Sequence, residues 1–374
     1  MAHGGHCVVR LEGRVIFVRH AIPGETVTVR LTDTGKAKFW RGDVAEVLSP
    51  SPERVRPPCP VAGTCGGCDF QHVAPAHQRE LKRRVVAEQL QRLAGITWEG
   101  RVEKVGDDPL GWRTRMRYVT ETGMAGLRAH RSHDVVEMPP GGCRIADPRG
   151  PRTDDLHQLA REAEGRDMVV ATGEPVSVIA GREVLQGHRS VRERVGERLF
   201  QVAADGFWQP HRDAPEVLTR AVLQSLKPRH GDVGLDLYCG VGLFGAALAD
   251  RGVRVIGVEQ DRRAAGTAAR NVPEAEIITG PLERNLADLP HEVDIIVLDP
   301  PRTGAGEKVV TRLAGLGART ICYVACDPAA LARDLATFAG LGWHAEKIRA
   351  FDLFPMTHHV ECVATLTRTS TEAL

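Results

Sequence analysis

The sequence has no run of ~18 consecutive apolar residues, so nothing in it predicts a membrane-spanning helix. Its first residues, Met1 to His6, lack the charged and apolar regions of a signal peptide. No internal repeat and no low-complexity tract is present. The nine cysteines are an odd number, which argues against a closed set of disulfides. We therefore expect a cytoplasmic protein without a membrane partner, whose reduced thiols serve as metal ligands, nucleophiles or core residues.

A strong overall charge is also lacking, since the formal net charge of the 374 residues is +1. The balance hides an asymmetry, because residues 1–131 carry a net charge of +7 and residues 205–374 carry −4. A basic front joined to a mildly acidic back suits a polyanion-binding module attached to a catalytic domain. Ordinary surface charge would explain the same values. The length is sufficient for two or three domains.

The first predicted domain, residues 1–54, is rich in short strands that suggest a small OB-like barrel. Basic residues surround two aromatic residues in this segment, a composition that a surface for single-stranded nucleic acid needs. The residues are Lys36, Lys38, Phe39, Trp40 and Arg41. Either aromatic side chain could instead belong to the core. A proline-rich linker, residues 49–58, follows the barrel.

The second predicted domain, residues 55–204, begins with three cysteines within ten residues, Cys59, Cys65 and Cys68. Gly66 and Gly67 would let the backbone curl, so that several thiolates reach one centre. Cys143 is the best candidate for a fourth ligand, because it lies alone in a glycine-rich turn. Four thiolates fit either zinc or an iron–sulfur cluster, and the spacing does not decide between them.

The second predicted domain also contains a predicted helix and a row of arginines. The pattern over residues 77–94 predicts a helix that could pack on the catalytic domain. Arg113, Arg115 and Arg117 alternate, so on a strand they would share one face and could meet successive phosphates. An exposed edge strand protected by charge would show the same pattern.

The third predicted domain, residues 205–374, alternates helices with apolar strands, which predicts a doubly wound α/β sheet. A glycine-rich loop, Gly240-x-Gly242-x-x-Gly245, follows one of these strands, and the next strand ends in Glu259. Glycines allow a ligand to approach the backbone closely, and Glu259 could accept hydrogen bonds from ribose hydroxyls. A dinucleotide and S-adenosylmethionine fit this loop equally well.

Three chemically active residues lie at predicted strand ends. Cys326 ends an apolar strand and precedes an Asp-Pro turn, and Asp299 ends another strand before Pro300 and Pro301. Glu361 enters the last strand after an apolar loop that could raise its pKa. Because ligands bind beyond the carboxyl ends of strands in such sheets, we expect Cys326 and Asp299 to face a substrate or cofactor.

A thiol and a carboxylate beside a methyl donor suit methylation at carbon-5 of uracil. Addition of a thiolate to carbon-6 makes carbon-5 nucleophilic, and a base must then remove the carbon-5 proton. Cys326 fits the first role and Glu361 the second, with His358 or His359 as the next candidates for the base.

With these motifs, the chain resembles the RNA 5-methyluridine methyltransferases over nearly its whole length. The resemblance implies a class I (Rossmann-like) S-adenosylmethionine-dependent methyltransferase sheet, an N-terminal TRAM barrel and a central iron–sulfur domain. It also implies that a [4Fe-4S] cluster is bound by Cys59, Cys65, Cys68 and Cys143. The residues that it assigns to S-adenosylmethionine are Gln209, Tyr238, Gly240, Gly242, Glu259 and Asp299. Leu243 and His211 depart from the residues common in the family.

Because barrel and cluster occur together, the resemblance is greater to the 23S rRNA enzymes than to the bacterial tRNA enzyme. We therefore expect an RNA substrate, with rRNA favoured over tRNA, and no obligate protein partner. The alternatives are an amino-group methyltransferase that uses Asp299-Pro300-Pro301, an NAD-dependent oxidoreductase and a non-catalytic RNA-binding protein.

Overall fold

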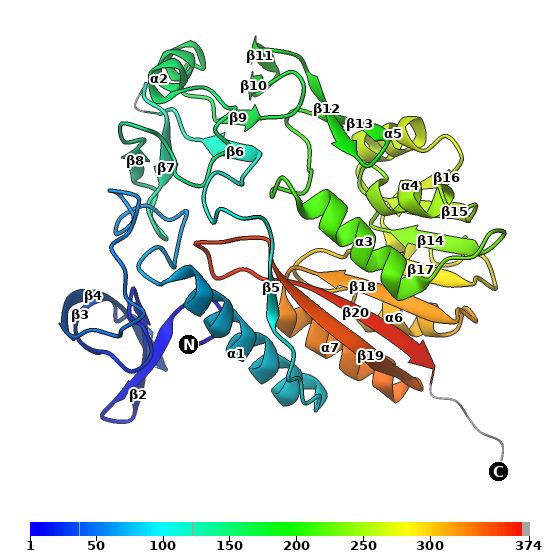
Figure 1. Cartoon of the computed structure of the whole chain (residues 1–374), viewed down its shortest axis with the longest axis horizontal. Helices are drawn as coiled ribbons and strands as arrows, with labels where there is room; N and C mark the ends of the chain where they lie inside the picture. The colour runs from blue at the N-terminus through cyan, green and yellow to red at the C-terminus, as the bar shows by residue number, and fades with distance from the viewer. Residues whose placement is uncertain (37, 122, 369–374) are drawn as a thin grey trace.

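The computed structural model describes residues 1–36, 38–121 and 123–368. Its largest sheet has eight strands in the order β16-β15-β14-β17-β18-β20-β19-β5 (Figure 1). The strands are β5 (Val102–Lys104), β14 (Val233–Leu237), β15 (Arg254–Glu259), β16 (Glu276–Thr279), β17 (Ile295–Leu298), β18 (Thr320–Ala325), β19 (Trp343–Asp352) and β20 (Glu361–Arg368). The predicted doubly wound sheet is therefore confirmed, although β5 and β16 were not predicted as strands.

The order of the strands reverses beside β14. Strands β14 to β18 pair in parallel, whereas β20 is antiparallel to both of its neighbours, β18 and β19. The chain leaves β14 toward β15 on one side and later returns to β17 on the other. Such a reversal of strand order opens a ligand-binding crevice beyond the carboxyl ends of the strands.

Helices cover both faces of the sheet (Figure 1). Side chains of α3 (Ala214–Leu226) and α4 (Leu243–Ala249) share one buried apolar cluster with the sheet. Side chains of α6 (Glu307–Ala314) and α7 (Pro328–Gly340) belong to the cluster on the opposite face. Helix α5 (Arg262–Asn271) and the short 3-10 helix Leu282–Arg284 complete this part of the chain. Two apolar layers thus hold the sheet rigid beneath its carboxyl edge.

Helix α1 (Pro75–Ala94) packs on the catalytic sheet, as its sequence pattern allowed. Val86 and Leu90 belong to the same apolar cluster as α7, and Gly95 ends the helix in a left-handed conformation (φ 67°). Lys82, also on α1, is fully buried, and its Nζ lies 2.6 Å from Asp352 Oδ1 at the end of β19. A charged contact therefore ties the N-terminal half of the chain to the last strands of the sheet.

The rest of the central region forms smaller sheets. A four-stranded sheet has the order β11-β10-β9-β6, with β12 and β13 as one hairpin and β7 and β8 as another. The bounds are β6 (Arg115–Tyr118), β7 (Gly126–Arg128), β8 (Val135–Glu137), α2 (Thr153–Glu162), β9 (Met168–Ala171), β10 (Ser177–Ala180), β11 (Glu183–Gln186), β12 (Ser190–Val195) and β13 (Arg198–Ala203). The domain boundaries after residues 54 and 204 stay a prediction.

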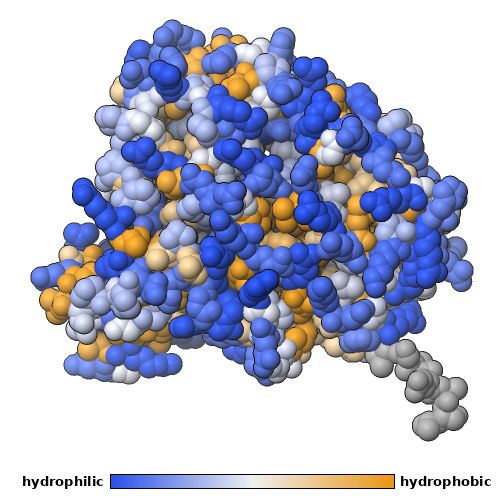
Figure 2. All heavy atoms as spheres, viewed as in Figure 1, coloured by the Kyte–Doolittle hydropathy of each residue, from blue (hydrophilic) through white to orange (hydrophobic). Residues whose placement is uncertain are grey.

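The N-terminal segment forms a four-stranded sheet of order β1-β2-β4-β3 around a small core. Its strands are β1 (Cys7–Leu11), β2 (Arg14–Arg19), β3 (Thr26–Asp33) and β4 (Phe39–Ser49). In Figure 2, apolar side chains gather at the left edge, over β3 and β4, while hydrophilic ones predominate elsewhere on that face. No helix among the described residues is long and apolar enough to cross a membrane.

We predict that Lys82→Met destabilises the catalytic sheet, because it leaves the Asp352 carboxylate buried without its cation. Loss of one partner of a buried ion pair typically costs about 3–5 kcal/mol of unfolding free energy. Urea unfolding would measure the loss. Lys104→Met is the control, since Lys104 is exposed and its Nζ lies 3.5 Å from Asp107. That change should cost less than about 1 kcal/mol, and equal losses in the two variants would contradict the prediction.

Candidate active site

The strand register brings Cys326 and Glu361 together. In the antiparallel pairing of β18 with β20, Ala325 lies opposite Cys362. Cys326 follows Ala325, and Glu361 precedes Cys362, so the two residues are neighbours at the edge of the sheet. Asp327, the next residue, caps α7 by accepting hydrogen bonds from Ala329 N and Ala330 N through Oδ1. The cap fixes the turn that presents Cys326.

Burial disfavours the charged forms of both groups in the free protein. Glu361 is 3% exposed, and burial, followed by the charge of Asp299, raises its pKa well above the usual range. Burial also raises the pKa of the Cys326 thiol to about 11, and the Glu361 carboxyl adds to this rise. The expected rise in the pKa of Glu361 is thus confirmed. The site stores a nucleophile that is protonated at neutral pH.

Arg302 supplies positive charge to this group. Its cationic side chain lowers the pKa of both Cys326 and Glu361, against the larger effect of burial. Its guanidinium also lies 3.3 Å from His359 Nε2. No pattern in the sequence assigned this role to Arg302, so it was missed.

Asp299 stands at the carboxyl end of β17, where Asp299 N donates to Leu237 O at 3.2 Å. Gln209 Nε2 donates to Asp299 Oδ2 at 3.4 Å, which joins two residues 90 positions apart that the resemblance assigned to the cofactor. Burial raises the pKa of Asp299 to about 7. Burial likewise raises the pKa of Asp236, near the end of β14, to about 7. A cationic ligand placed here would favour the ionised carboxylates.

The glycine-rich loop after β14 needs its glycines. Gly242 has φ 91°, and a Cβ there would lie 2.7 Å from a methyl carbon of Val272. Gly240 N donates to Glu259 Oε2 at 2.9 Å, and Asp261 N donates to Glu259 Oε1 at 2.7 Å. The Glu259 carboxylate therefore fixes the backbone of the loop through these two contacts. Its oxygens retain lone pairs that could accept hydrogen bonds from a ribose.

Tyr238 and Asp236 carry buried polar atoms without a partner. Tyr238 adopts φ 60°, an uncommon conformation for a residue other than glycine. Its hydroxyl is buried and has no hydrogen-bond partner among the described residues, and the same holds for Asp236 Oδ1. Buried polar groups are normally satisfied, so both atoms are candidates for contact with a ligand or an ordered water.

The two departures from the family pattern have structural explanations. His211 stacks on Trp112 with ring centroids 5.6 Å apart, and its Nδ1 accepts a hydrogen bond from Asp213 N. Burial lowers the pKa of His211 to about 4, so the ring is neutral. Leu243 is buried at the start of α4, in the apolar cluster beneath the loop. Both side chains serve packing.

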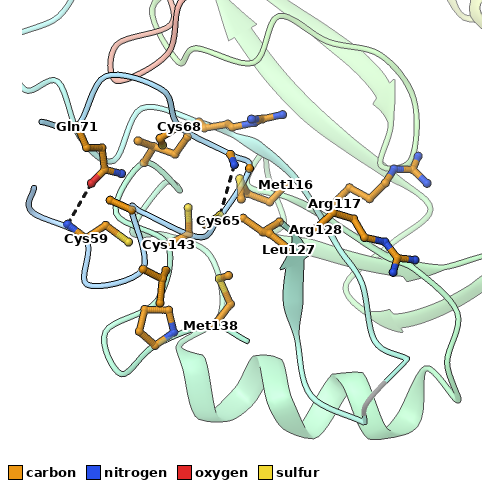
Figure 3. A pocket seen from close by; sticks show the side chains of 17 residues that line it. Cys59, Cys65, Cys68, Gln71, Met116, Arg117, Leu127, Arg128, Met138 and Cys143 are labelled. Atoms are coloured by element: carbon orange, nitrogen blue, oxygen red, sulfur yellow. Dashed lines mark hydrogen bonds between the residues drawn. The ribbon is translucent and has the colours of Figure 1, made fainter. Parts of the chain in front are cut away.

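The four predicted metal-binding cysteines line one cavity of about 230 Å³. Figure 3 shows Cys59, Cys65, Cys68 and Cys143 around it, with Met116, Leu127 and Met138 as apolar neighbours. All four are free thiols, and burial raises the pKa of Cys68 to about 12. Among the described residues, however, no group of three or more His, Cys, Asp or Glu is arranged to hold a single metal ion.

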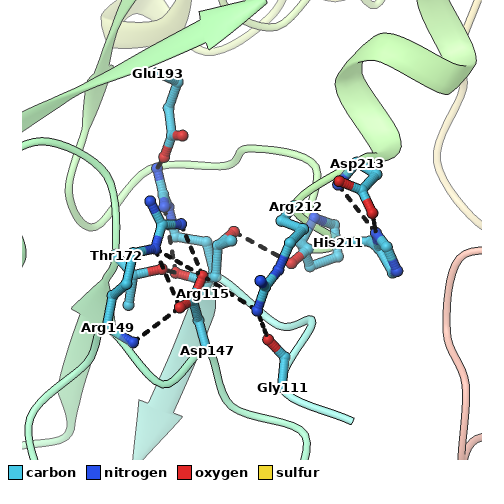
Figure 4. Close-up of polar contacts among 11 residues, drawn as sticks. Gly111, Arg115, Asp147, Arg149, Thr172, Glu193, His211, Arg212 and Asp213 are labelled. Atoms are coloured by element: carbon cyan, nitrogen blue, oxygen red, sulfur yellow. Dashed lines mark hydrogen bonds and ion pairs between the residues drawn. The ribbon is translucent and has the colours of Figure 1, made fainter. Parts of the chain in front are cut away.

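The three predicted arginines do not form one exposed row. Arg113 lies outside β6, which begins at Arg115. The Arg115 guanidinium is largely buried and lies 2.9 Å from the Glu193 carboxylate (Figure 4). Arg117 is exposed. The expectation that Arg115 meets a phosphate is therefore wrong, because Glu193, 78 positions away, already neutralises it.

The basic residues of the barrel remain accessible in part. Lys36 and Lys38 are exposed, while Arg41 packs over the Phe39 ring with its guanidinium carbon 5.1 Å from the ring centroid. Trp40 packs against the barrel core, and Arg14 covers its ring at 4.1 Å. Of the two aromatic residues, Trp40 thus belongs to the core, which was one of the two interpretations of the sequence.

The N-terminus also reaches the site, which the sequence did not indicate. His3 Nε2 lies 3.0 Å from Asp327 Oδ2, one residue from Cys326. The N-terminal segment therefore contacts the residue next to the candidate nucleophile.

Comparison with known proteins identifies relatives over the whole chain. Residues 282–369 match the tRNA (Uracil-5-)-methyltransferase family, residues 212–316 the methyltransferase small domain, and residues 2–45 the TRAM domain. An uncharacterized RNA methyltransferase of Streptomyces avermitilis is 47% identical, with 98% of this chain and 96% of the relative covered. A 23S rRNA (uracil(1939)-C(5))-methyltransferase of Acidithiobacillus ferrooxidans is 31% identical, with 97% and 95% covered.

One solved structure covers 97% of this chain and 100% of its own. It is the tRNA (uracil-54, C5)-methyltransferase of Pyrococcus abyssi in complex with S-adenosyl-L-homocysteine, with a TM-score of 0.73. At 24% sequence identity, the likeness shows a shared fold.

The pKa of Cys326 generates a prediction for the free protein. Because the thiolate is the reactive form, alkylation of Cys326 by iodoacetamide should rise about tenfold per pH unit from pH 7 to 10. Glu361→Gln removes the carboxyl whose ionised form raises the pKa of Cys326, so it should speed alkylation at the upper end of this pH range. Arg302→Gln removes a positive charge and should slow it. Mass spectrometry of the alkylated peptide measures each rate. A plateau already reached near pH 7 would contradict the burial argument.

Proposed function

The chain belongs to the RNA uracil-5-methyltransferase family, and we propose that it methylates uracil through a covalent bond between Cys326 and carbon-6, with Glu361 as the base. Its fold and family make S-adenosylmethionine the methyl donor. The observation that carries the proposal is the pairing of Ala325 with Cys362, which sets Cys326 beside Glu361. An amino-group methyltransferase or an NAD-dependent oxidoreductase would have no use for this pair, and neither alternative has support from the relatives.

In the proposed reaction, the Cys326 thiol gives its proton to solvent water, and the thiolate sulfur adds to carbon-6 of the uracil. The electron pair of the ring double bond moves toward carbon-5, which then attacks the methyl group of the donor. S-adenosylhomocysteine leaves with the electrons of the broken carbon–sulfur bond. Glu361 removes the proton from carbon-5, the ring double bond re-forms, and the Cys326 thiolate is expelled.

The electrostatics of the site support this division of roles. Once the cationic methyl donor favours its ionised form, the Glu361 carboxylate can accept the carbon-5 proton, and its raised pKa lets it hold that proton after the transfer. Arg302 favours the thiolate that must form. The target base would have to leave any stack to reach the sheet edge, a cost of a few kcal/mol that contacts with RNA must offset.

For the methyl donor, we propose the residues around the glycine-rich loop. Gln209 and Asp299 would hold the amino acid end, since a carboxylate and an amide suit a zwitterion. Tyr238, Gly240 and Gly242 would line the loop that approaches the ligand. Glu259 would accept hydrogen bonds from the ribose, with the lone pairs that its two backbone contacts leave free.

For Cys59, Cys65, Cys68 and Cys143, we propose a [4Fe-4S] cluster rather than zinc. Zinc with four thiolates needs every sulfur about 2.3 Å from one ion. The cysteines instead surround a cavity of about 230 Å³, which suits a polynuclear group with one thiolate on each iron. The apolar lining would shield the cluster from water. The cluster would link the segment of residues 59–68 to the turn that contains Cys143.

As substrate we propose structured RNA, with rRNA favoured over tRNA. A relative with 31% identity over nearly the whole chain is named for 23S rRNA. Lys36, Lys38 and Arg41 of the barrel, with Arg113 and Arg117, are the candidate phosphate contacts. A cytoplasmic location without an obligate protein partner remains our prediction.

The mechanism predicts different failures for two variants. Cys326→Ala should neither bond to RNA nor transfer the methyl group. Glu361→Gln should add to uracil and accept the methyl group, then stall, because the carbon-5 proton stays in place. Denaturing gels with a donor labelled in the methyl group would show a labelled protein–RNA adduct for Glu361→Gln alone. Methylation by Cys326→Ala would disprove the covalent route, and normal turnover of Glu361→Gln would assign the base to another group.

The cluster proposal predicts about four iron atoms and matching sulfide in protein isolated without oxygen. Cys68→Ser should lose most of the iron. Cys322→Ser is the matched control, because Cys322 is buried in the sheet away from the cavity. Metal analysis by mass spectrometry decides the matter, and about one zinc without iron would contradict the proposal.

A further inference from the structure

The loop between β19 and β20, residues 353–360, leads directly into Glu361, the first residue of β20. One residue of this loop has an unusual backbone conformation. Met356 is almost fully buried and has φ 67°, a left-handed conformation that favours glycine. A bulky residue persists in this conformation only where its surroundings hold it. Strand pairing sets the register of Glu361, and the contacts that hold Met356 fix the loop that leads into it.

Gln78 of α1 holds the loop from one side. Its Oε1 accepts a hydrogen bond from Met356 N at 2.9 Å. Its Nε2 donates to Phe70 O at 3.0 Å and to Val73 O at 2.8 Å. Gln78 is 1% exposed, so water does not compete for these contacts. One buried amide thus joins the catalytic loop to the segment that follows Cys68.

The segment after Cys68 holds the loop from the other side. Asp69 N and Phe70 N both donate to Met356 O at 2.9 Å. Asp69 Oδ2 also lies 2.6 Å from His358 Nδ1. Both backbone polar groups of Met356 are therefore satisfied by residues nearly 300 positions away in the sequence. Cys68 and Met356 also share one small apolar cluster.

We propose that Gln78 is a positioning residue for the deprotonation step, which acts by fixing the Met356 loop and so the place of Glu361. The inference rests on the proposed role of Glu361. It makes the helix α1 and the cysteine-bearing segment part of the catalytic scaffold, although neither contributes a reacting atom. The addition of Cys326 to the uracil needs no residue of this loop. It should therefore proceed without Gln78.

The test is Gln78→Met, which keeps the volume of the side chain and removes its three contacts with backbone atoms. Single-turnover reactions with RNA and methyl-labelled donor should form the adduct within about threefold of the normal rate. Resolution of the adduct should slow at least about tenfold, so that methylated protein–RNA adduct accumulates on denaturing gels. Hydrogen exchange at Met356 N should also increase, while β19 and β20 stay protected.

Two further variants make the result specific. Gln89→Leu removes another buried amide from α1, eleven residues along the helix and thus about 16 Å from Gln78, and should behave as the unchanged protein. Glu361→Gln is the positive control for a stalled adduct. If Glu361→Gln stalls and Gln78→Met resolves normally, the inference is overturned, while the assigned base stands.

A purely structural role for Gln78 would slow adduct formation and resolution by the same factor, and that outcome also overturns the inference. If Glu361→Gln does not stall, the proposed base is wrong, and the positioning role falls with it. Should Gln78→Met fail to fold, Gln78→Asn withdraws the same amide by one methylene. The same pattern of fast addition and slow resolution is expected from it.

Discussion

The antiparallel pairing of β18 with β20 is the contact on which the site depends. It places the residue that ends one strand beside the residue that begins the other, and these are Cys326 and Glu361. Parallel β17 then sets Asp299 at the same edge. A slip of the register by two residues would separate the thiol from the carboxyl by about 7 Å. The chemistry is therefore a consequence of strand order, and the helices on both faces of the sheet hold that order in place.

Burial determines the charge of this edge. Cys326, Glu361, Asp299 and Asp236 all have raised pKa values because water is excluded around them. Arg302 opposes the rise at the first two. Binding of a cationic methyl donor would favour ionisation of the carboxylates, which links donor binding to the charge state of the site. The free protein thus keeps its nucleophile protonated until substrates arrive.

Much of the fold and of the site could be predicted from the sequence, wherever the local pattern of residues determines the structure. The alternation of helices and apolar strands over residues 205–374 is present as predicted, because apolar runs and turn residues act locally. What failed depended on distant partners. Arg115 could not be known to meet Glu193, and nothing local marks Met356 as left-handed or His3 as a neighbour of Asp327. Strand β5 has only three residues and exists because β19 offers it an edge.

The covalent step can be tested most directly with RNA in which 5-fluorouridine replaces uridine. Fluorine at carbon-5 cannot leave as a proton does, so a reaction through addition at carbon-6 must stop after methyl transfer. We expect mass spectrometry of the digested complex to find the methylated, fluorinated nucleotide bonded to the peptide that contains Cys326. Recovery of unmodified protein, while the same preparation methylates ordinary RNA, would contradict the account.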